Sequence, residues 1–325
     1  MRINPAWRLT AAPDGSVSVG CGPDALNLGP VHPADREWLR SLSSGTPAPD
    51  PVDAEQARRW ASLGVALASV IAPVSTEGLP GLAAQRLSSD SSDWAAAYGQ
   101  SAGPRVRSRL DRRVWLGGAD RCGMAVAFTL AAAGVGSLSV RDDARVEAGD
   151  LGTSPLRLTE LGLPRPVALQ RHLQRLYPHA HLLAPVTLDQ ALRGCDALVL
   201  VARDGLDPAD AALLATSTVP VLPVVFHESG FRVGPLLLPG APGCPECAVL
   251  AWPLLPSGEL LSGLPPSPET TSAALAAGLC AQVIVMVLDG VNVPSCAGGS
   301  YVGTLGAASL HFEELPSSCS HAQAA

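Results

Sequence analysis

The sequence predicts an α/β protein whose core is a mostly parallel, Rossmann-type sheet. From Arg113 onward, short apolar stretches alternate with longer helical ones, which is typical of a parallel sheet. The first stretch runs into a glycine-containing loop, where Rossmann domains bind the phosphates of a nucleotide. The expected strands are Val114–Leu116, Gly136–Val140, His181–Leu183, Ala197–Val201 and Val219–Phe226, and the expected helices are Met124–Ala133, Val167–Tyr177 and Asp207–Thr216.

Length, charge and hydropathy limit the possible functions. A chain of 325 residues has room for two or three units, one of them with a full core. The net charge of −7, without a long basic run, argues against nucleic acid as a partner. The N-terminus lacks the pattern of a signal peptide, so we expect a cytoplasmic protein. The apolar stretch Ala273–Leu288 is short for a bilayer span of about 20 residues, and we expect a buried or dimer-facing helix and no membrane partner.

Residues 1–75 are expected to form a small winged-helix-like module. Three strand-like stretches precede two helical ones, with a turn signal at Pro13–Gly15 between the first two strands. The expected elements are strands at Trp7–Leu9, Val17–Val19 and Leu26–Leu28, a helix from Pro33 that carries Trp38 and Leu42, and a helix over Ala54–Ile71. We assign residues 76–112 to a connector and residues 113–325 to the Rossmann domain with its C-terminal tail.

The glycine loop departs from the usual nucleotide-binding pattern. Gly118 and Gly123 fit the first and last positions of a G-x-G-x-x-G motif, whereas Asp120 occupies the middle one. The middle glycine lets the backbone approach a phosphate, and a carboxylate there repels phosphate from a helix N-terminus that otherwise favours anions. The loop therefore supports the fold and argues against ordinary ATP binding.

Three other aspartates end expected strands. Asp142 and Asp143 follow the second strand about 20 residues beyond the loop, where an acidic residue would bind a ribose hydroxyl. The alternative is that they are solvated carboxylates at a strand end. Asp204 follows the fourth strand, so it faces the ligand crevice and would hold magnesium, or else it caps a helix or belongs to a loop.

A pair of cysteines near the end of the sheet region predicts a structural zinc site. Cys244 and Cys247 have the spacing of a zinc knuckle, and Cys319 and His321 supply two further ligands. The alternatives are a redox Cys-Pro-x-Cys motif, which should follow a first strand, and packing without metal. The remaining five cysteines are expected to be small buried residues, namely Cys21, Cys122, Cys195, Cys280 and Cys296.

Residues 113–321 resemble the ThiF-like, E1-like proteins of actinobacterial clusters that make azol(in)e-type ribosomal peptides. The resemblance rests on the glycine loop, on Gly134–Gly136 leading to Asp142, and above all on Val233–Gly240 running into the cysteine pair. Arg165 stands where the family has a basic residue that opens a helix. The terminal Cys-x-His replaces the family's usual Cys-x-Cys.

The resemblance implies carboxylate adenylation with ATP and magnesium in active members. This sequence departs from them, since its nucleotide loop is degenerate at Asp120. After Asp150 it lacks an Arg-x-x-x-Gln-like pair, which leaves Arg157 and Arg165 as the nearby candidates to hold a triphosphate. No cysteine fits an E1-type thioester nucleophile.

The resemblance also implies that the N-terminal module binds the leader of a precursor peptide by strand addition. If the third strand is an edge, its free backbone groups can pair with that peptide; the alternative is a packing or dimerisation module. The first hypothesis is a homodimeric recognition protein that delivers the precursor to a partner enzyme. The second is an active adenylyltransferase in which Asp204 holds magnesium. An NAD-dependent oxidoreductase is disfavoured because the glycine loop is broken.

Overall fold

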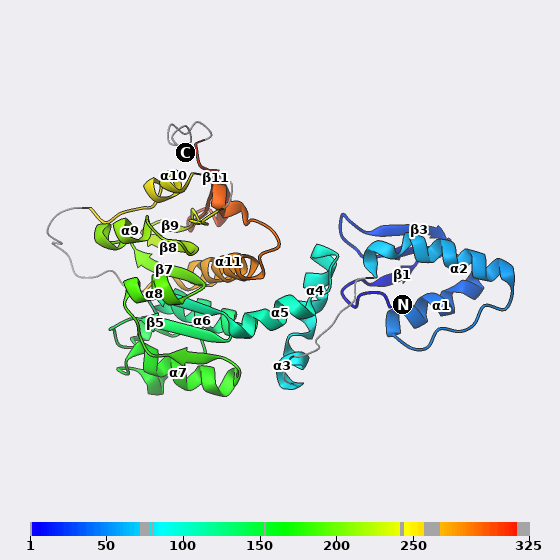
Figure 1. Ribbon diagram of the computed structural model, residues 1–325, viewed down its shortest axis with the longest axis horizontal. Coiled ribbons are helices and arrows are strands. Elements are labelled where there is room, and N and C mark those ends of the chain that lie inside the picture. The colour runs from blue at the N-terminus through cyan, green and yellow to red at the C-terminus, as the bar shows by residue number, and fades with distance from the viewer. Residues whose placement is uncertain are drawn as a thin grey trace. The chain divides into compact units, whose positions relative to one another are not determined.

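The computed structural model describes residues 2–71, 79, 81–152, 154–240, 244–256 and 267–316 (Figure 1). The chain divides into two compact units, Met1–Arg107 and Ser108–Ala325. The N-terminal unit thus includes most of the residues that the sequence assigned to a connector.

The N-terminal unit begins with a three-stranded antiparallel sheet in the order β1-β2-β3. Two helices follow, and their apolar faces share a core with the sheet in which Trp38 stacks on Trp60 at a centroid distance of 5.2 Å. The elements are β1 (Leu9–Ala11), β2 (Ser16–Val19), β3 (Leu26–Pro30), η1 (Pro33–Asp35), α1 (Arg36–Ser44), α2 (Ala54–Ala66) and η2 (Ala68–Val70). The first strand therefore begins two residues later than expected.

The start of α1 is fixed to α2 by a buried carboxylate. Asp35 accepts hydrogen bonds from Arg59 Nε at 2.7 Å, Trp60 Nε1 at 2.9 Å and Gln56 Nε2 at 3.1 Å. The hydrogen bond from Arg59, aided by the other two donors, lowers the pKa of Asp35 to about 2. Because all three donors lie on α2, this carboxylate joins the two helices.

The expected connector is largely helical. It contains α3 (Gly81–Arg86), α4 (Ser88–Tyr98), α5 (Gly103–Ser108) and the 3₁₀ turn η3 (Arg109–Asp111). The sequence did not indicate these helices because glycine and serine, which are poor helix formers, start all three of them. Packing of Trp94 against Tyr98 within α4, at a centroid distance of 4.6 Å, compensates in part.

The C-terminal unit is built on an eight-stranded sheet in the order β11-β10-β9-β8-β7-β4-β5-β6. Five neighbouring strands of this sheet pair in parallel, namely β8, β7, β4, β5 and β6. This confirms the predicted mostly parallel sheet. Three antiparallel strands extend it beyond β8, and the sequence analysis predicted none of the three. The strands are β4 (Arg113–Gly117), β5 (Ser137–Arg141), β6 (His181–Leu183), β7 (Ala197–Arg203), β8 (Val221–His227), β9 (Gly230–Val233), β10 (Gly299–Thr304) and β11 (Ser309–Glu314).

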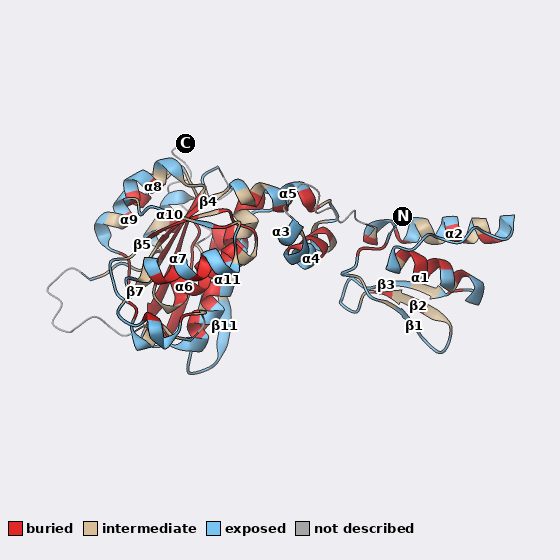
Figure 2. Cartoon of the chain, turned by 90° about the horizontal axis from the view of Figure 1, so that it is seen from below, coloured by how far each residue is buried: buried red, intermediate tan, exposed pale blue. Residues whose placement is uncertain are grey.

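Helices cover both faces of this sheet, and its central strands are buried between them (Figure 2). On β4, Val114 and Leu116 join the core with α6, α7 and α11, whereas Trp115 points into the core with α8 and α9. The bounds are α6 (Arg121–Ala132), α7 (Arg165–Leu176), α8 (Leu188–Gly194), α9 (Pro208–Leu214), α10 (Pro245–Leu250) and α11 (Thr270–Asp289), with 3₁₀ turns η4 (Ala148–Asp150), η5 (Leu158–Glu160) and η6 (Ser295–Gly298).

Helix α11 has 20 residues and is long and apolar enough, by composition, to cross a membrane. It is longer than its apolar stretch suggested. Its side chains Ala273, Ala277 and Ile284 lie in the core beside α6, so the expectation of a buried helix fits its surroundings. At its end Asp289 forms a buried, two-pronged ion pair with Arg109, at 2.7 and 2.8 Å.

Candidate functional site

The loop after β4 is held by close backbone contacts at its two glycines. Gly118 has φ +109°, and a Cβ there would lie 2.7 Å from Val201 O on β7. A Cβ on Gly123 would lie 2.2 Å from Gly118 O. Both positions therefore require glycine for the fold of the loop itself, whether or not a ligand binds.

Asp120 occupies the place where a Rossmann loop presents its helix N-terminus to an anion. It is the N-cap of α6, and its Oδ1 accepts hydrogen bonds from Cys122 N at 2.9 Å and Gly123 N at 3.0 Å. Burial raises the pKa of this carboxyl, although the two amide hydrogen bonds favour the charged form. The sequence predicted a repulsive charge, and the structure adds that the carboxylate itself engages these amides.

The ribose-binding candidate Asp142 and the helix-opening Arg165 belong to one network. Asp142 Oδ2 accepts hydrogen bonds from Ala119 N at 2.7 Å and from Arg165 Nη1 at 3.2 Å. Arg165 also donates twice to Asp150, at 2.9 Å each, and Ser267 Oγ donates to the same carboxylate at 2.8 Å. Asp150 is fully buried. The sequence placed Asp150 only within the resemblance and did not identify it as the partner of Arg165.

Arg121 ties two further segments to the glycine loop. Its Nη1 donates to Pro268 O at 2.6 Å and its Nη2 donates to Leu151 O at 3.2 Å. Sequence analysis overlooked this residue because its partners are backbone carbonyls about 30 and 147 positions away. The hydrogen bonds of Arg121, Asp120 and Arg165 therefore hold the glycine loop and its neighbouring segments together without a ligand.

A cavity of about 300 Å³ opens at the carboxyl ends of β4, β5 and β7. This edge is where open α/β sheets bind ligands. Four carboxylates and one guanidinium contribute to its lining, namely Asp142, Asp143, Asp207, Asp210 and Arg141. Such a lining disfavours a triphosphate without bound cations, since like charges repel.

Asp204 follows β7 in a left-handed conformation with φ 64°, and its amide donates to Phe226 O at 2.7 Å. Its carboxylate is half-exposed and lies 3.7 Å from Arg203 Nε. The residues that the structure describes contain no cluster of three or more His, Cys, Asp or Glu side chains fit for a metal. Its magnesium role stays a prediction.

Two of the four predicted zinc ligands are described. Cys244 is the N-cap of α10, and Cys247 lies in its first turn, so both half-buried thiols are at one helix end. The Cys244 thiol donates to Glu246 Oε2 at 3.0 Å. Cys319 and His321 lie outside the described residues. The two soft donors fit zinc by type and position, and the site stays a prediction.

Three other cysteines are buried as expected and chemically quiet. Burial raises the pKa of the thiols of Cys122 and Cys280, and raises that of Cys296 to about 12. A thiol that stays protonated at neutral pH is a poor nucleophile. Cys195 is only half-buried, and Cys21 is exposed, so the expectation of a buried residue is wrong for Cys21.

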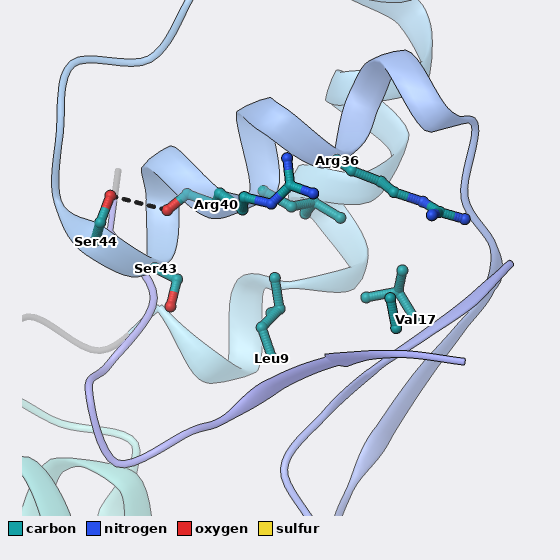
Figure 3. A pocket seen from close by; sticks show the side chains of 8 residues that line it. Leu9, Val17, Arg36, Arg40, Ser43 and Ser44 are labelled. Atoms are coloured by element: carbon teal, nitrogen blue, oxygen red, sulfur yellow. Dashed lines mark hydrogen bonds between the residues drawn. The ribbon is translucent and has the colours of Figure 1, made fainter. Parts of the chain in front are cut away.

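The N-terminal unit has a groove of about 570 Å³ between β1 and α1 (Figure 3). Within the described residues, both β1 and β3 are edges of the sheet, and the groove lies beside β1. The predicted edge was β3. The lining residues are Leu9, Ala11, Val17, Arg36, Leu39, Arg40, Ser43 and Ser44.

This architecture, a mostly parallel sheet with an antiparallel extension and a glycine loop before α6, supports the predicted ThiF/E1-like fold. No family model and no curated protein sequence matches the chain. Among solved structures, PaaA has a TM-score of 0.73 at 15% identity, covering 95% of this chain and 98% of PaaA. The microcin C7 biosynthetic enzyme MccB in complex with N-formylated MccA has a TM-score of 0.71 at 15% identity, covering 98% of each chain. Escherichia coli MccB with ATP likewise has a TM-score of 0.71 at 15% identity, covering 98% of each chain. At these identities the likeness shows the fold.

Proposed function

We propose that this chain is a ThiF/E1-like protein of ribosomal peptide biosynthesis that binds a precursor leader peptide and delivers it to a partner enzyme. The observation that carries the non-adenylating part is the cap at Asp120, whose carboxylate bonds the Cys122 and Gly123 amides. An anion that reaches a helix N-terminus uses such amides. Here a phosphate would have to displace the carboxylate.

The peptide part rests on the fold and on the N-terminal groove. Solved structures of MccB contain MccA. The match to them covers 98% of this chain, so the likeness extends to its N-terminal residues. A groove beside an open strand edge suits an extended peptide, because the edge offers backbone donors and acceptors. We propose that the winged-helix-like unit is the docking module, and that the protein acts as a homodimer with a separate modifying enzyme.

The nucleotide test is calorimetric titration of ATP with magnesium into the full-length protein and into Asp120→Gly and Asp120→Asn. We expect no measurable binding to the wild type. Asp120→Gly frees the two amides and removes a like charge, so it should gain affinity, whereas Asp120→Asn keeps an acceptor at the N-cap and should gain less.

The second candidate is an adenylyltransferase in which Asp204 holds magnesium and Arg165 binds phosphate. The observation in its favour is that Asp142 and Arg165 meet beside the loop and are bonded at 3.2 Å. Solved MccB also exists with ATP and with AMPCPP. Pyrophosphate exchange by the wild type on addition of a precursor peptide would establish this function and remove the non-adenylating proposal.

We propose that Cys244, Cys247, Cys319 and His321 bind one structural zinc ion. Metal analysis of purified protein should then find about one zinc per chain, and Cys244→Ser should lose it and destabilise the C-terminal unit. Cys21→Ser is the matched control, because Cys21 is an exposed cysteine of the other unit. Zinc-free protein whose stability is unchanged in Cys244→Ser would refute the site.

Peptide binding is tested with a precursor encoded beside the gene for this chain. Labelled leader peptide should bind the full-length protein with micromolar affinity or better, and removal of residues 1–75 should abolish binding while leaving the zinc in place. Unchanged binding by the truncated protein would move the recognition site to the C-terminal unit. Light scattering of the purified protein measures the expected homodimer directly.

A further inference from the structure

We infer that the groove between β1 and α1 binds an extended acidic peptide, which adds to the sheet beside β1 and meets Arg36 and Arg40 with carboxylates at alternate positions. The inference rests on the proposed function and deepens it, since it names the edge that the peptide uses and the chemistry that is recognised. It also moves the peptide from the predicted edge β3 to β1.

The backbone of β1 is available for pairing on its outer side. Gly20 N donates to Arg8 O at 2.8 Å, which makes Arg8 a position that bonds β2. Bonded and non-bonded positions alternate along an antiparallel pair, so the N–H and C=O groups of Leu9 and Ala11 point away from β2. Among the described residues no strand pairs with that side. An incoming strand can therefore bond Leu9 and Ala11.

The groove has an apolar floor with a polar rim on α1. Leu9 and Ala11 supply the accessible apolar surface, and the buried side chains of Val17 and Leu39 also line the groove. Ser43 and Ser44 lie toward the end of the helix. The Ser44 hydroxyl donates a hydrogen bond to Arg40 O at 2.9 Å, so this hydroxyl already has a partner within α1. The apolar floor can contact a peptide strand that lies in the groove. The positive charge of the rim favours acidic side chains on the face of that strand that is turned toward α1.

Two guanidinium groups lie along the rim without an acidic partner among the described residues. Arg36 Nε is buried and makes no hydrogen bond there. The adjacent Asp35 is bound to Arg59, and Asp14 in the nearby turn accepts hydrogen bonds from Ser16 N at 2.9 Å and Ser16 Oγ at 2.7 Å. Arg36 is only partly buried and Arg40 is exposed, so a ligand can reach both guanidinium groups, and a carboxylate is their strongest hydrogen-bond partner.

The spacing of the two arginines matches an extended chain. Arg36 and Arg40 lie four residues apart on α1, a rise of about 6 Å along the helix axis. Alternate residues of a strand lie about 6.6 Å apart and face the same side. Figure 3 shows both arginines on α1, with Leu9 and Val17 across the groove from them. Carboxylates at positions i and i+2 of the peptide can therefore meet the two arginines together.

The test uses fluorescence anisotropy of full-length protein with three fluorescein-labelled decapeptides at low ionic strength. They carry Glu, Gln or Lys at alternate positions and are otherwise identical. We expect the Glu peptide to bind at least tenfold more tightly than the Gln peptide, and the Lys peptide not to bind. The double variant Arg36→Gln/Arg40→Gln should erase the preference for Glu. Equal binding of the Glu and Gln peptides, no binding of either, or a preference that survives in the double variant overturns the inference.

Two controls separate folding and pairing from charge. Arg58→Gln removes an exposed arginine of the same unit that has no ion-pair partner among the described residues, and it should leave the preference intact. Peptide N-methylated on the amides that would face β1 should lose binding, whereas methylation of the opposite amides should not. Equal loss from both methylated peptides overturns strand addition. Circular dichroism melting checks that the double variant is folded.

The outcome is distinguishable from failure of the proposed function. If a leader peptide binds the wild type and the double variant equally, the groove inference is wrong. The proposed peptide binding is then retained, with its site elsewhere on the protein. If the Glu peptide binds as expected but the leader does not, the acidic groove stands and the proposed peptide role is wrong.

Discussion

The loop before α6 and the groove beside β1 both hold charged side chains at a place suited to a ligand, but only the loop pairs its charges internally. Arg165 bonds Asp142 and Asp150, and Asp120 bonds the amides of α6. In the groove, Arg36 and Arg40 have no acidic partner among the described residues. A charge that the fold has already neutralised stabilises the structure. A charge that the fold leaves unpaired is available to a ligand.

The largest effect should come from Arg165→Ala, because it leaves the buried Asp150 and the largely buried Asp142 without their cation. We expect a loss of about 3–5 kcal/mol in the free energy of unfolding of the C-terminal unit, measured by urea denaturation. Arg193→Ala is the matched control, since its pair with Asp189 is exposed and should cost less than about 0.5 kcal/mol. Equal small losses would mean that the loop network is kept for a ligand.

Asp35→Asn should destabilise the N-terminal unit by about 2–3 kcal/mol, since it breaks the carboxylate that joins α1 to α2. The pKa of Asp35 is lowered to about 2 from the usual 3.8, so its contribution is complete above about pH 4 and is lost as the pH falls toward 2. Thermal melts of wild type and Asp35→Asn should therefore converge between pH 4 and pH 2. Parallel curves over that range would contradict this role.

Asp120→Ala should cost about 1 kcal/mol, the usual effect of removing an N-cap, and Asp120→Asn only a few tenths. Denaturant titration of both variants measures the difference. If Asp120→Ala were neutral, the carboxylate would not be stabilising the loop, and the contrast with the groove would lose its main support.

The smallest effect is expected for Arg40→Gln, which should change the free energy of unfolding by less than about 0.5 kcal/mol. Arg40 is exposed and lies one turn from the like charge of Arg36, so the fold gains little from it. Thermal melting checks this. A loss above 1 kcal/mol would make the arginine structural and would weaken its assignment to a ligand.

Much of the site could be predicted from the sequence because its residues lie at the ends of recognisable strands. The glycine loop, Asp142 and Arg165 were located by their distance from β4 and by the family resemblance. Their pairing could not be predicted, since Asp142 and Arg165 are 23 residues apart and meet only when β5 and α7 pack together. The charge at Asp120 was visible in the sequence, while its role as a helix cap depended on where α6 begins.

The sequence by itself determined the parallel sheet and the two buried helices α6 and α11, because strand–helix alternation and apolar stretches are local signals. Only the tertiary structure decided which edge of the N-terminal sheet faces a groove and which arginines remain unpaired. Leu9 and Arg40 come together there through the packing of α1 on the sheet. An unpaired charge is a property of all the surroundings of a side chain, and these surroundings come from segments distant in the sequence.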